Sequence, residues 1–400
     1  MLCRITVALA GLAGASALAA DWPRWRGPEA NGISSETVAP WSDAGPRKLW
    51  QAEIGLGFSS ISVAQGRAYT MGFVPGSDVL TCLDATTGKL LWKHADPGEQ
   101  MENVYEGGPN ATPTVDGGTV FTFTRRGKVC ALDAATGRLI WQRELAKELG
   151  AKMPTWGFSS SPLVQGRILV LNLGEAGAGL DKTTGEVVWK SGPGASGYAT
   201  AVPFDFKGRH LVALFSSREL VAVDPQTGTV AWRHPWKTLD DINAADPVIL
   251  GERLLLSSGD NRGAALLQLT GDAPTVLWEN KNLRAQFTPP VVLGEHIYGL
   301  DGNAGERATL RCIDTASGEV KWTGPVVGTG GILAANGRLV VLSDRGELAL
   351  YDVSPAGFKE LARAQILGGK CWTNPALSGG RIYARNAKGT LVCYDLAAGK

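Results

Sequence analysis

Short apolar runs recur along the chain, and glycine-containing turns separate them. Clear examples are VAQGRAYTM from Val63, VQGRILVL from Val164, LGEHIYGL from Leu293, ANGRLVVL from Ala335 and SGGRIYAR from Ser378. In each segment the turn lies between two short stretches, which is typical of a β-hairpin. We therefore expect many short antiparallel strands. One segment, RELAKELGAKMP from Arg143, has a helical pattern instead and predicts a short helix between two sheets.

An eleven-residue motif of the form small-x-Asp-x-x-(Thr/Ser)-Gly-x-x-x-Trp repeats along the chain. Five copies are CLDATTGKLLW (82–92), ALDAATGRLIW (131–141), GLDKTTGEVVW (179–189), AVDPQTGTVAW (222–232) and CIDTASGEVKW (312–322). Three weaker copies are QLTGDAPTVLW (268–278), LYDVSPAGFKEL (350–361) and CYDLAAGK (393–400). The chain therefore contains eight copies, too many to arise by chance.

The tryptophans of the motif are spaced 42 to 49 residues apart, starting from Trp50. This is the period of a propeller blade with four strands. The last copy ends at Lys400 without a Trp strand, whereas RKLWQAE around Trp50 is a Trp strand with no motif before it. We predict an all-β fold, an eight-bladed β-propeller of four-stranded blades, in which the Trp50 strand completes the last blade and closes the ring. Closure removes the exposed sheet edges of an open array.

The motif itself has a structural interpretation. Asp and Thr side chains bind backbone groups of a tight turn, and Gly accepts the positive φ that the turn needs. The Trp then packs against a neighbouring strand or blade and buries an area on the order of 200 Å². We assign this structural role to Trp50, Asp84, Gly88, Trp92, Asp133, Gly137, Trp141, Asp181, Gly185, Trp189, Asp224, Gly228, Trp232, Trp278, Asp314, Gly318, Trp322, Asp352 and Asp395.

The N-terminus has the features of a secretory signal peptide. Arg4 precedes an apolar segment from Ile5 to about Leu18, and small residues at Ala17 and Ala19 are spaced for cleavage. The segment is short for a bilayer span of roughly 20 residues, and no later apolar run could span a membrane. We expect a signal peptide over residues 1–19, an N-terminal extension over 20–48 and the propeller over 49–400.

The charge of the chain argues against nucleic acid as a partner, and the positions of the cysteines predict their state. Cleavage of the signal would leave 38 basic and 38 acidic side chains, so nucleic acid is not an expected partner. Three of the five remaining cysteines, Cys82, Cys312 and Cys393, occupy the small first position of the motif, which predicts buried free thiols. We expect an exported protein, periplasmic or extracellular and soluble, with no transmembrane segment, and a monomer.

The repeats resemble those of pyrroloquinoline quinone (PQQ) quinoprotein dehydrogenases and of the BamB-type outer-membrane assembly factor. The resemblance covers the whole mature chain. DWPRWRGPEANGIS after the signal and WGFSSSPLVQGRILVLNLG from Trp156 are similar to exported PQQ-like propeller proteins. The resemblance implies an eight-bladed propeller. For the dehydrogenases it also implies a calcium–PQQ pair at the channel mouth with an Asp as the base.

The sequence departs from the dehydrogenases in several motifs. They share a vicinal Cys-Cys pair over the quinone, whereas no two cysteines are adjacent here, and the Cys-x-x-Cys-His haem motif is missing. Those enzymes are also substantially longer. The four histidines are scattered along the chain without metal-ligand spacing, and P-loop, Gly-x-Ser-x-Gly and EF-hand motifs are missing too. We therefore assign no catalytic residue and no metal ligand.

If the chain has a binding site, we expect it where the loops before each innermost strand meet around the channel. These loops carry polar and aromatic residues before a Pro, as in YEGGPNATP (105–113) and KCWTNP (370–375). The residues that could line this mouth are Glu106, Asn110, Trp156, Tyr198, Asn243, Asp246, Arg284, Gln286, Lys370, Trp372 and Asn374. The alternative is that they are ordinary turn formers and that a Trp fills the channel.

Two functional hypotheses follow from the sequence. The favoured one is a binding or interaction scaffold in the cell envelope, which needs no cofactor and binds an envelope protein or a small ligand at the channel mouth. The alternative is a PQQ- and calcium-dependent quinoprotein oxidoreductase, similar to alcohol dehydrogenases, that uses the carboxylates of Glu106 and Asp246.

Overall fold

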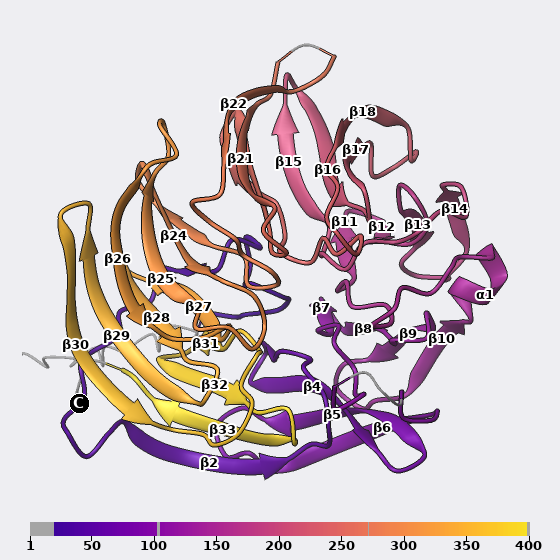
Figure 1. Cartoon of the computed structure of the whole chain (residues 1–400). Helices are drawn as coiled ribbons and strands as arrows, with labels where there is room; N and C mark the ends of the chain where they lie inside the picture. Colours follow the sequence, from indigo (N-terminus) through magenta and orange to yellow (C-terminus); the bar gives the residue numbers. More distant parts are fainter. Residues whose placement is uncertain (1–19, 102–104, 271, 398–400) are drawn as a thin grey trace, which may run out of the picture.

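The computed structural model describes residues 20–101, 105–270 and 272–397, and it forms a ring of eight antiparallel sheets (Figure 1). We number the blades in chain order. Blade 1 contains β3 (Ser62–Ala64), β4 (Arg67–Val74), β5 (Ser77–Asp84) and β6 (Leu90–Pro97). Blade 2 contains β7 (Thr114–Asp116), β8 (Thr119–Phe123), β9 (Val129–Asp133) and β10 (Leu139–Arg143). Blade 3 contains β11 (Leu163–Gln165), β12 (Ile168–Leu171), β13 (Ala178–Asp181) and β14 (Val187–Lys190).

The next three blades repeat the same order of strands. Blade 4 contains β15 (Val202–Phe206), β16 (Arg209–Phe215), β17 (Glu219–Val223) and β18 (Val230–Pro235). Blade 5 contains β19 (Val248–Leu250), β20 (Arg253–Ser258), β21 (Gly263–Gln268) and β22 (Thr275–Asn280). Blade 6 contains β23 (Val291–Leu293), β24 (His296–Asp301), β25 (Thr309–Asp314) and β26 (Val320–Val326).

The last two blades include strands from the N-terminal part of the chain. Blade 7 contains β27 (Gly331–Ala335), β28 (Arg338–Leu342), β29 (Glu347–Ser354) and β30 (Gly357–Gln365), and β1 (Ile33–Ser34) pairs with β27 in parallel. Blade 8 contains β31 (Ala376–Ser378), β32 (Arg381–Arg385) and β33 (Thr390–Asp395), with β2 (Arg47–Glu53) as its outer strand. Trp50 lies opposite Cys393 in the antiparallel pair. The predicted eight blades and the predicted closure are both confirmed.

The repeated motif joins each blade to the next. Asp84 Oδ1 accepts hydrogen bonds from the backbone N–H groups of Thr86 and Thr87, and Gly88 has a φ of +72°. The indole of Trp50, from the preceding blade, donates to the carbonyl of Ala85 and covers Gly88 so closely that a Cβ there would lie 2.6 Å from the ring. The motif glycine therefore serves both the turn and the contact with the neighbouring blade.

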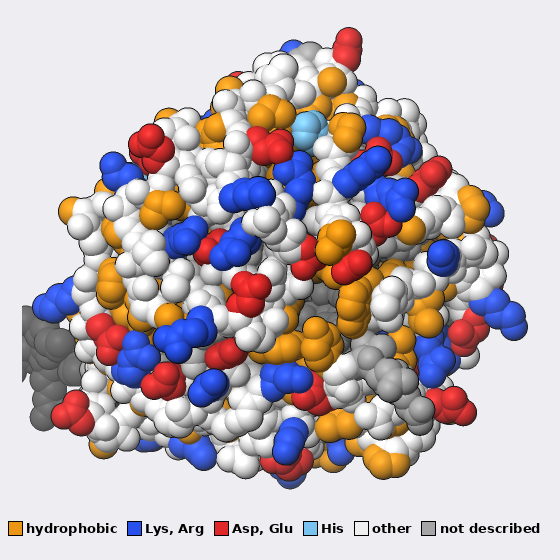
Figure 2. Space-filling view, viewed as in Figure 1, with side chains coloured by type: hydrophobic (Ala, Val, Ile, Leu, Met, Phe, Trp, Pro, Cys, Tyr) orange, Lys and Arg blue, Asp and Glu red, His pale blue; other side chains and the backbone are white. Residues whose placement is uncertain are grey.

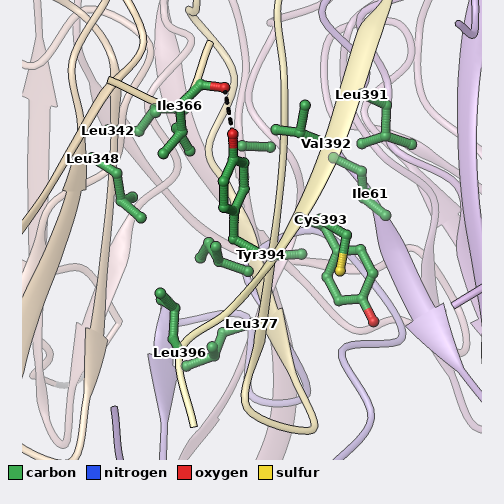
Figure 3. Close-up of a cluster of buried hydrophobic side chains, with 14 of the residues drawn as sticks. Ile61, Leu342, Leu348, Ile366, Leu377, Leu391, Val392, Cys393, Tyr394 and Leu396 are labelled. Carbon is green, nitrogen blue, oxygen red and sulfur yellow. Dashed lines mark hydrogen bonds between the residues drawn. The ribbon is translucent and has the colours of Figure 1, made fainter. Parts of the chain in front are cut away.

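The hydrophobic core lies between adjacent blades. Figure 3 shows one cluster, in which Leu342 and Leu348 of blade 7 face Leu377 and Tyr394 of blade 8. The Tyr394 hydroxyl donates to the carbonyl of Ile366 at 3.2 Å, so the polar atom of a buried ring is satisfied. The two middle strands of blade 1, β4 and β5, are buried along most of their length, and most of their residues are apolar.

An N-terminal strap, residues 20–38, runs across one end of the ring, and in Figure 1 its indigo trace passes behind the orange strands. Its backbone pairs with Val63 of blade 1 and with Val115 of blade 2. Near its end, the Glu36 carboxylate accepts the backbone N–H groups of Gly379 and Gly380 in blade 8. The strap is therefore an integral part of the ring.

The remaining expectations concern the helix, the thiols and the membrane. The short helix α1 (Leu145–Leu149) lies between blades 2 and 3, as predicted, and Gly150 caps its end at a φ of +64°. All five cysteines between residues 20 and 397 are free and buried, which confirms the predicted thiols.

The described residues contain no helix with the length and apolar character of a membrane span. The predicted signal peptide, residues 1–19, lies outside the described residues.

Candidate functional site: the central cavity

A belt of hydrogen bonds links blades 1 to 5 around the channel. It is formed by one residue in each loop before an innermost strand: Ser60, Thr112, Ser161, Thr200 and Asp246. The backbone N–H of each of the first four donates to the side chain of the next at 2.8 to 3.1 Å. The polar loop residues therefore serve first to join neighbouring blades.

The belt continues from blade 7 to blade 1 through Asn374. Asn374 Oδ1 accepts the N–H of Ile332, and its carbonyl accepts the hydroxyl of Ser60 at 2.7 Å. Blade 6, by contrast, carries two prolines, Pro289 and Pro290, before its innermost strand, so these positions offer neither a backbone N–H nor a polar side chain. The belt is therefore interrupted between blades 5 and 6.

The N-terminal strap bridges this interruption. The Trp25 indole donates to Asp246 Oδ2 in blade 5 at 2.6 Å, and Arg26 Nη2 donates to the carbonyl of Pro290 in blade 6 at 2.6 Å. Arg26 Nη2 also donates to the carbonyl of Asn31 within the strap. Two adjacent residues of the strap thus replace the missing contact between two blades.

A cavity of about 190 Å³ lies at the channel, between the loops and the strap. Its lining includes Trp25, Phe58, Met101, Tyr105, Asn110, Thr112, Arg125, Trp156, Ser159, Ser161, Tyr198, Thr200, Asp246, Gln286, Phe287 and Trp372. On the face shown in Figure 2, hydrophobic side chains gather around a hollow near the centre of the ring. The cavity therefore combines seven aromatic side chains with a similar number of hydroxyl, amide and carboxylate groups.

The aromatic residues of the cavity form a cluster around Trp372. Its ring centroid lies 5.8 Å from Phe58 in a stacked arrangement, 5.1 Å from Tyr105 and 5.6 Å from Phe287. Lys370 Nζ lies 4.6 Å from the same ring, within the range of a cation–π contact. Because four loops contribute to it, this cluster holds blades 1, 2, 6 and 8 together around the cavity.

The charged groups beside the aromatic cluster are paired. Lys370 Nζ lies 2.9 Å from Glu106, and buried Arg125 lies 3.2 Å from buried Asp78. Burial raises the pKa of Asp78 to about 6 even though Arg125 acts in the opposite direction. Burial also raises the pKa of Asp246 to about 6, opposed by the positive charge of Arg26 and by the hydrogen bonds that Asp246 accepts.

The eleven residues that the sequence analysis singled out fall into three groups. Six line the cavity, and they are Asn110, Trp156, Tyr198, Asp246, Gln286 and Trp372. Glu106 and Lys370 pair with each other beside the aromatic cluster. The last three have structural partners: Asn243 donates to the carbonyls of Ser216 and Ser217, Asn374 belongs to the belt, and Arg284 pairs with Asp301.

Several lining residues are not among those eleven. Trp25 comes from the strap and Arg125 from the turn between β8 and β9, whereas Met101 lies in the loop between β6 and β7, before the stretch 105–113 quoted from the sequence. Phe58 and Phe287 lie in loops before an innermost strand, and each is followed directly by Ser or Thr, so an aromatic residue beside a hydroxyl residue is the signal that could have found them. For Trp25 the local signal is the pair of tryptophans within WPRW, in a segment that lacks the repeat.

A family model described as "Outer membrane protein assembly factor BamB" matches residues 76–324 and again 307–400. The chain belongs to this family. Among solved structures, BamB from Moraxella catarrhalis is 17% identical with a TM-score of 0.65 over 88% of this chain and 100% of that chain. No curated protein matches the sequence.

The BamB family fold is also shared by enzymes. A europium-containing methanol dehydrogenase is 14% identical with a TM-score of 0.66, over 91% of this chain and 89% of that chain. The quinohemoprotein alcohol dehydrogenase from Comamonas testosteroni is 14% identical with a TM-score of 0.68, over 95% and 81%. At such identities the likeness shows the fold alone, because one fold carries many functions.

The charged side chains in and beside this BamB-family cavity already have protein partners. Calcium takes six to eight oxygen ligands from carboxylates, amide or backbone carbonyls and waters. Within the described residues, no group of three or more His, Cys, Asp or Glu side chains could hold a metal ion. Asp246 lines the cavity, but its two oxygens already accept hydrogen bonds from Trp25 and Thr200. PQQ is a multiply charged acid and would need cationic partners. The nearby cationic side chains, Arg125 and Lys370, are paired with Asp78 and Glu106.

Proposed function

We propose that this protein is an exported binding scaffold of the cell envelope and that its central cavity is the binding surface. The observation that carries the proposal is a cavity that is rich in aromatic side chains and in which the charged groups already have protein partners. Such a lining suits binding, because a catalytic centre usually holds a charged or nucleophilic group that is free to act on a substrate.

The rigidity of the cavity also supports a binding role. The belt fixes the loops of five consecutive blades through hydrogen bonds of about 3 Å, and the strap fixes the interruption between blades 5 and 6. A binding surface held in place before the ligand arrives loses less conformational freedom on binding. The match to the BamB family model agrees with a scaffold role.

A PQQ-dependent oxidoreductase is the second candidate. It is favoured by the shared fold of the alcohol and methanol dehydrogenases and by the presence of a carboxylate, Asp246, in the cavity lining. The other expected carboxylate, Glu106, is paired with Lys370. The two carboxylates would therefore have to give up protein partners before they could bind calcium.

One reconstitution experiment separates the two candidates. The purified chain is incubated with PQQ and either calcium or a lanthanide ion, and thermal unfolding and dye-linked oxidation of primary alcohols are measured. The scaffold proposal predicts no shift in unfolding temperature and no oxidation above a control without protein. A cofactor-dependent shift together with alcohol oxidation that Asp246→Asn abolishes would overturn it.

Use of the cavity is tested with variants of its lining. Trp372→Ala opens the aromatic cluster, whereas Phe358→Ala removes a ring that is 40% exposed on the outer strand of blade 7. In affinity capture from an envelope extract, a specific partner should be retained by Phe358→Ala and lost by Trp372→Ala. Equal retention by both variants would contradict the assignment of binding to the cavity.

A further inference from the structure

Three hydroxyl groups of the belt accept hydrogen bonds but donate none to the described residues. Thr112, Ser161 and Thr200 each accept a backbone N–H from the preceding blade, and all three line the cavity. Each is at most 8% exposed. Within the described residues, none of these hydroxyls donates a hydrogen bond to the protein. Because a hydroxyl can donate one bond and accept others, blades 2, 3 and 4 offer three donors along one wall.

The aromatic part of the lining favours an apolar, ring-like ligand body. Phe58, Phe287, Trp372 and Trp156 are all partly exposed and line the cavity. Aromatic side chains interact best with other planar rings, in offset stacks or edge to face, at centroid distances of about 4.5 to 7 Å. A sugar or another polyol would leave most of its hydroxyl groups without partners against such a surface.

The charges around the cavity favour a neutral ligand. The charges of Arg125 and Lys370 are paired with those of Asp78 and Glu106, although Nε and Nη1 of Arg125 have no hydrogen-bond partner within the described residues. The Asp246 carboxylate lines the cavity and would repel an anion that entered beside it. An anionic acid would therefore lose its hydration without gaining a free cation in return.

The size of the cavity favours a ligand of one or two rings. Pockets for drug-sized ligands measure about 300 to 1,000 Å³. At about 190 Å³ the cavity is smaller than these. A compound of one or two rings fits such a space.

We propose that the central cavity binds a small neutral aromatic compound that presents a carbonyl oxygen to the hydroxyls of Thr112, Ser161 and Thr200. The inference rests on the proposed function, because it takes the cavity as the binding surface. The carbonyl accepts from the hydroxyl wall, and the ring packs against the aromatic cluster around Trp372. Aromatic esters, amides and ketones of one or two rings belong to this class.

The test uses calorimetric titration of the full chain with methyl 4-hydroxybenzoate as the neutral probe. The matched probes are 4-hydroxybenzoate, which has the same ring but an anionic carboxylate, and D-glucose. We expect the ester to bind, the anion to bind at least tenfold more weakly, and glucose to give no binding heat. Equal affinity for ester and anion, binding of glucose alone, or no binding of the ester would each overturn the proposal.

Variants connect binding to the hydroxyl wall. Thr200→Ser keeps the hydroxyl and should bind the ester within about twofold of the parent, whereas Thr200→Val should lose at least fivefold. Because Thr200→Val also removes an acceptor from the belt, Phe287→Ala serves as a second variant that breaks no hydrogen bond, and Phe358→Ala as a control outside the cavity. Loss of binding in Phe287→Ala but not in Phe358→Ala supports the site, and the reverse contradicts it.

The two proposals fail in different ways. If the ester does not bind while a captured partner still depends on Trp372, the ligand class is wrong and the scaffold proposal stands. If PQQ with calcium supports alcohol oxidation, the scaffold proposal itself is wrong, whatever the ester does.

Discussion

The indole nitrogen of Trp25 donates a 2.6 Å hydrogen bond to the carboxylate of Asp246, 221 residues away in the chain. This contact joins the N-terminal strap to blade 5 at the point where blade 6 carries Pro289 and Pro290 in place of a donor. Asp246 is 3% exposed and also accepts the N–H of Thr200. The stability of the ring therefore depends on a buried carboxyl whose pKa is raised to about 6.

We predict a distinctive pH dependence for Asp246→Asn. With a folded-state pKa near 6 and an ordinary value of 3.8, the folded state retains a proton between about pH 4 and pH 6 that the unfolded state has released. The carboxyl thus stabilises the fold fully below about pH 4, and this contribution is lost as the pH rises through about 6. We therefore expect the unfolding free energy of the parent to decrease relative to that of Asp246→Asn between about pH 4 and about pH 7, as measured by urea titrations.

Asp84→Asn is the control for that measurement. Desolvation acts to raise the pKa of Asp84, but the hydrogen bonds that it accepts from the turn together outweigh this effect and lower the pKa. Its contribution is therefore present above its ordinary pKa and is lost as the pH falls. The two variants should show opposite slopes, and parallel slopes would contradict the assignment for Asp246.

A second prediction concerns two adjacent serines in the loop before blade 3. Ser161 Oγ accepts the backbone N–H of Thr112, whereas Ser160 Oγ is buried without a hydrogen-bond partner within the described residues. Ser161→Ala leaves a buried N–H unpaired and should cost about 1 to 3 kcal/mol of unfolding free energy. Ser160→Ala removes an unsatisfied hydroxyl and should be neutral or stabilising. If both variants lose the same unfolding free energy in urea, the belt hydrogen bond of Ser161 contributes nothing to stability.

Local chemistry explains why the scaffold could be predicted from the sequence. Asp84, Gly88 and Trp92 lie within one eleven-residue motif, so turn chemistry and periodicity identify them without long-range information. The closing role of Trp50 could be predicted because the last copy of the motif lacks a Trp strand, whereas the Trp50 strand has no motif before it. These inferences needed only the repeat, and the ring confirms them.

The contacts of the cavity could not be predicted in the same way. Asn110 and Asn374 both stand in loops just before a Pro, yet Asn110 lines the cavity and Asn374 is used by the backbone of blade 7. The partner of Trp25 depends on the path of the strap across the ring. Local propensity and the repeat period do not predict that path, because the strap carries no copy of the motif.

A third prediction compares two glycines with similar backbone conformations. Gly88 has a φ of +72° and lies under the ring of Trp50, whereas Gly66 has a φ of +75° and open space within 4 Å of the point where a Cβ would stand. Gly66→Ala should cost only the backbone strain, about 1 to 2 kcal/mol. Gly88→Ala should cost more, because the added methyl group also displaces the indole. Thermal unfolding measures both, and a larger loss for Gly66→Ala would contradict the interpretation.

A fourth prediction uses two tryptophans of the motif that differ in one hydrogen bond. The Trp189 indole donates to the carbonyl of Pro225 at 2.8 Å, in the motif turn of the next blade. The Trp232 indole has no partner within the described residues, and the copy that follows it, QLTGDAPTVLW, lacks the motif Asp. The two side chains are 8% and 5% exposed, so replacement by Phe removes a similar packing contribution at each site.

Trp189→Phe leaves the carbonyl of Pro225 without its donor, whereas Trp232→Phe removes a buried N–H that has no partner among the described residues. We therefore expect Trp189→Phe to lose roughly 1 kcal/mol more unfolding free energy than Trp232→Phe. Urea unfolding of both variants, followed by far-UV circular dichroism, checks the difference. An equal or larger loss for Trp232→Phe would mean that ring packing alone, and not the hydrogen bond, joins each blade to the next.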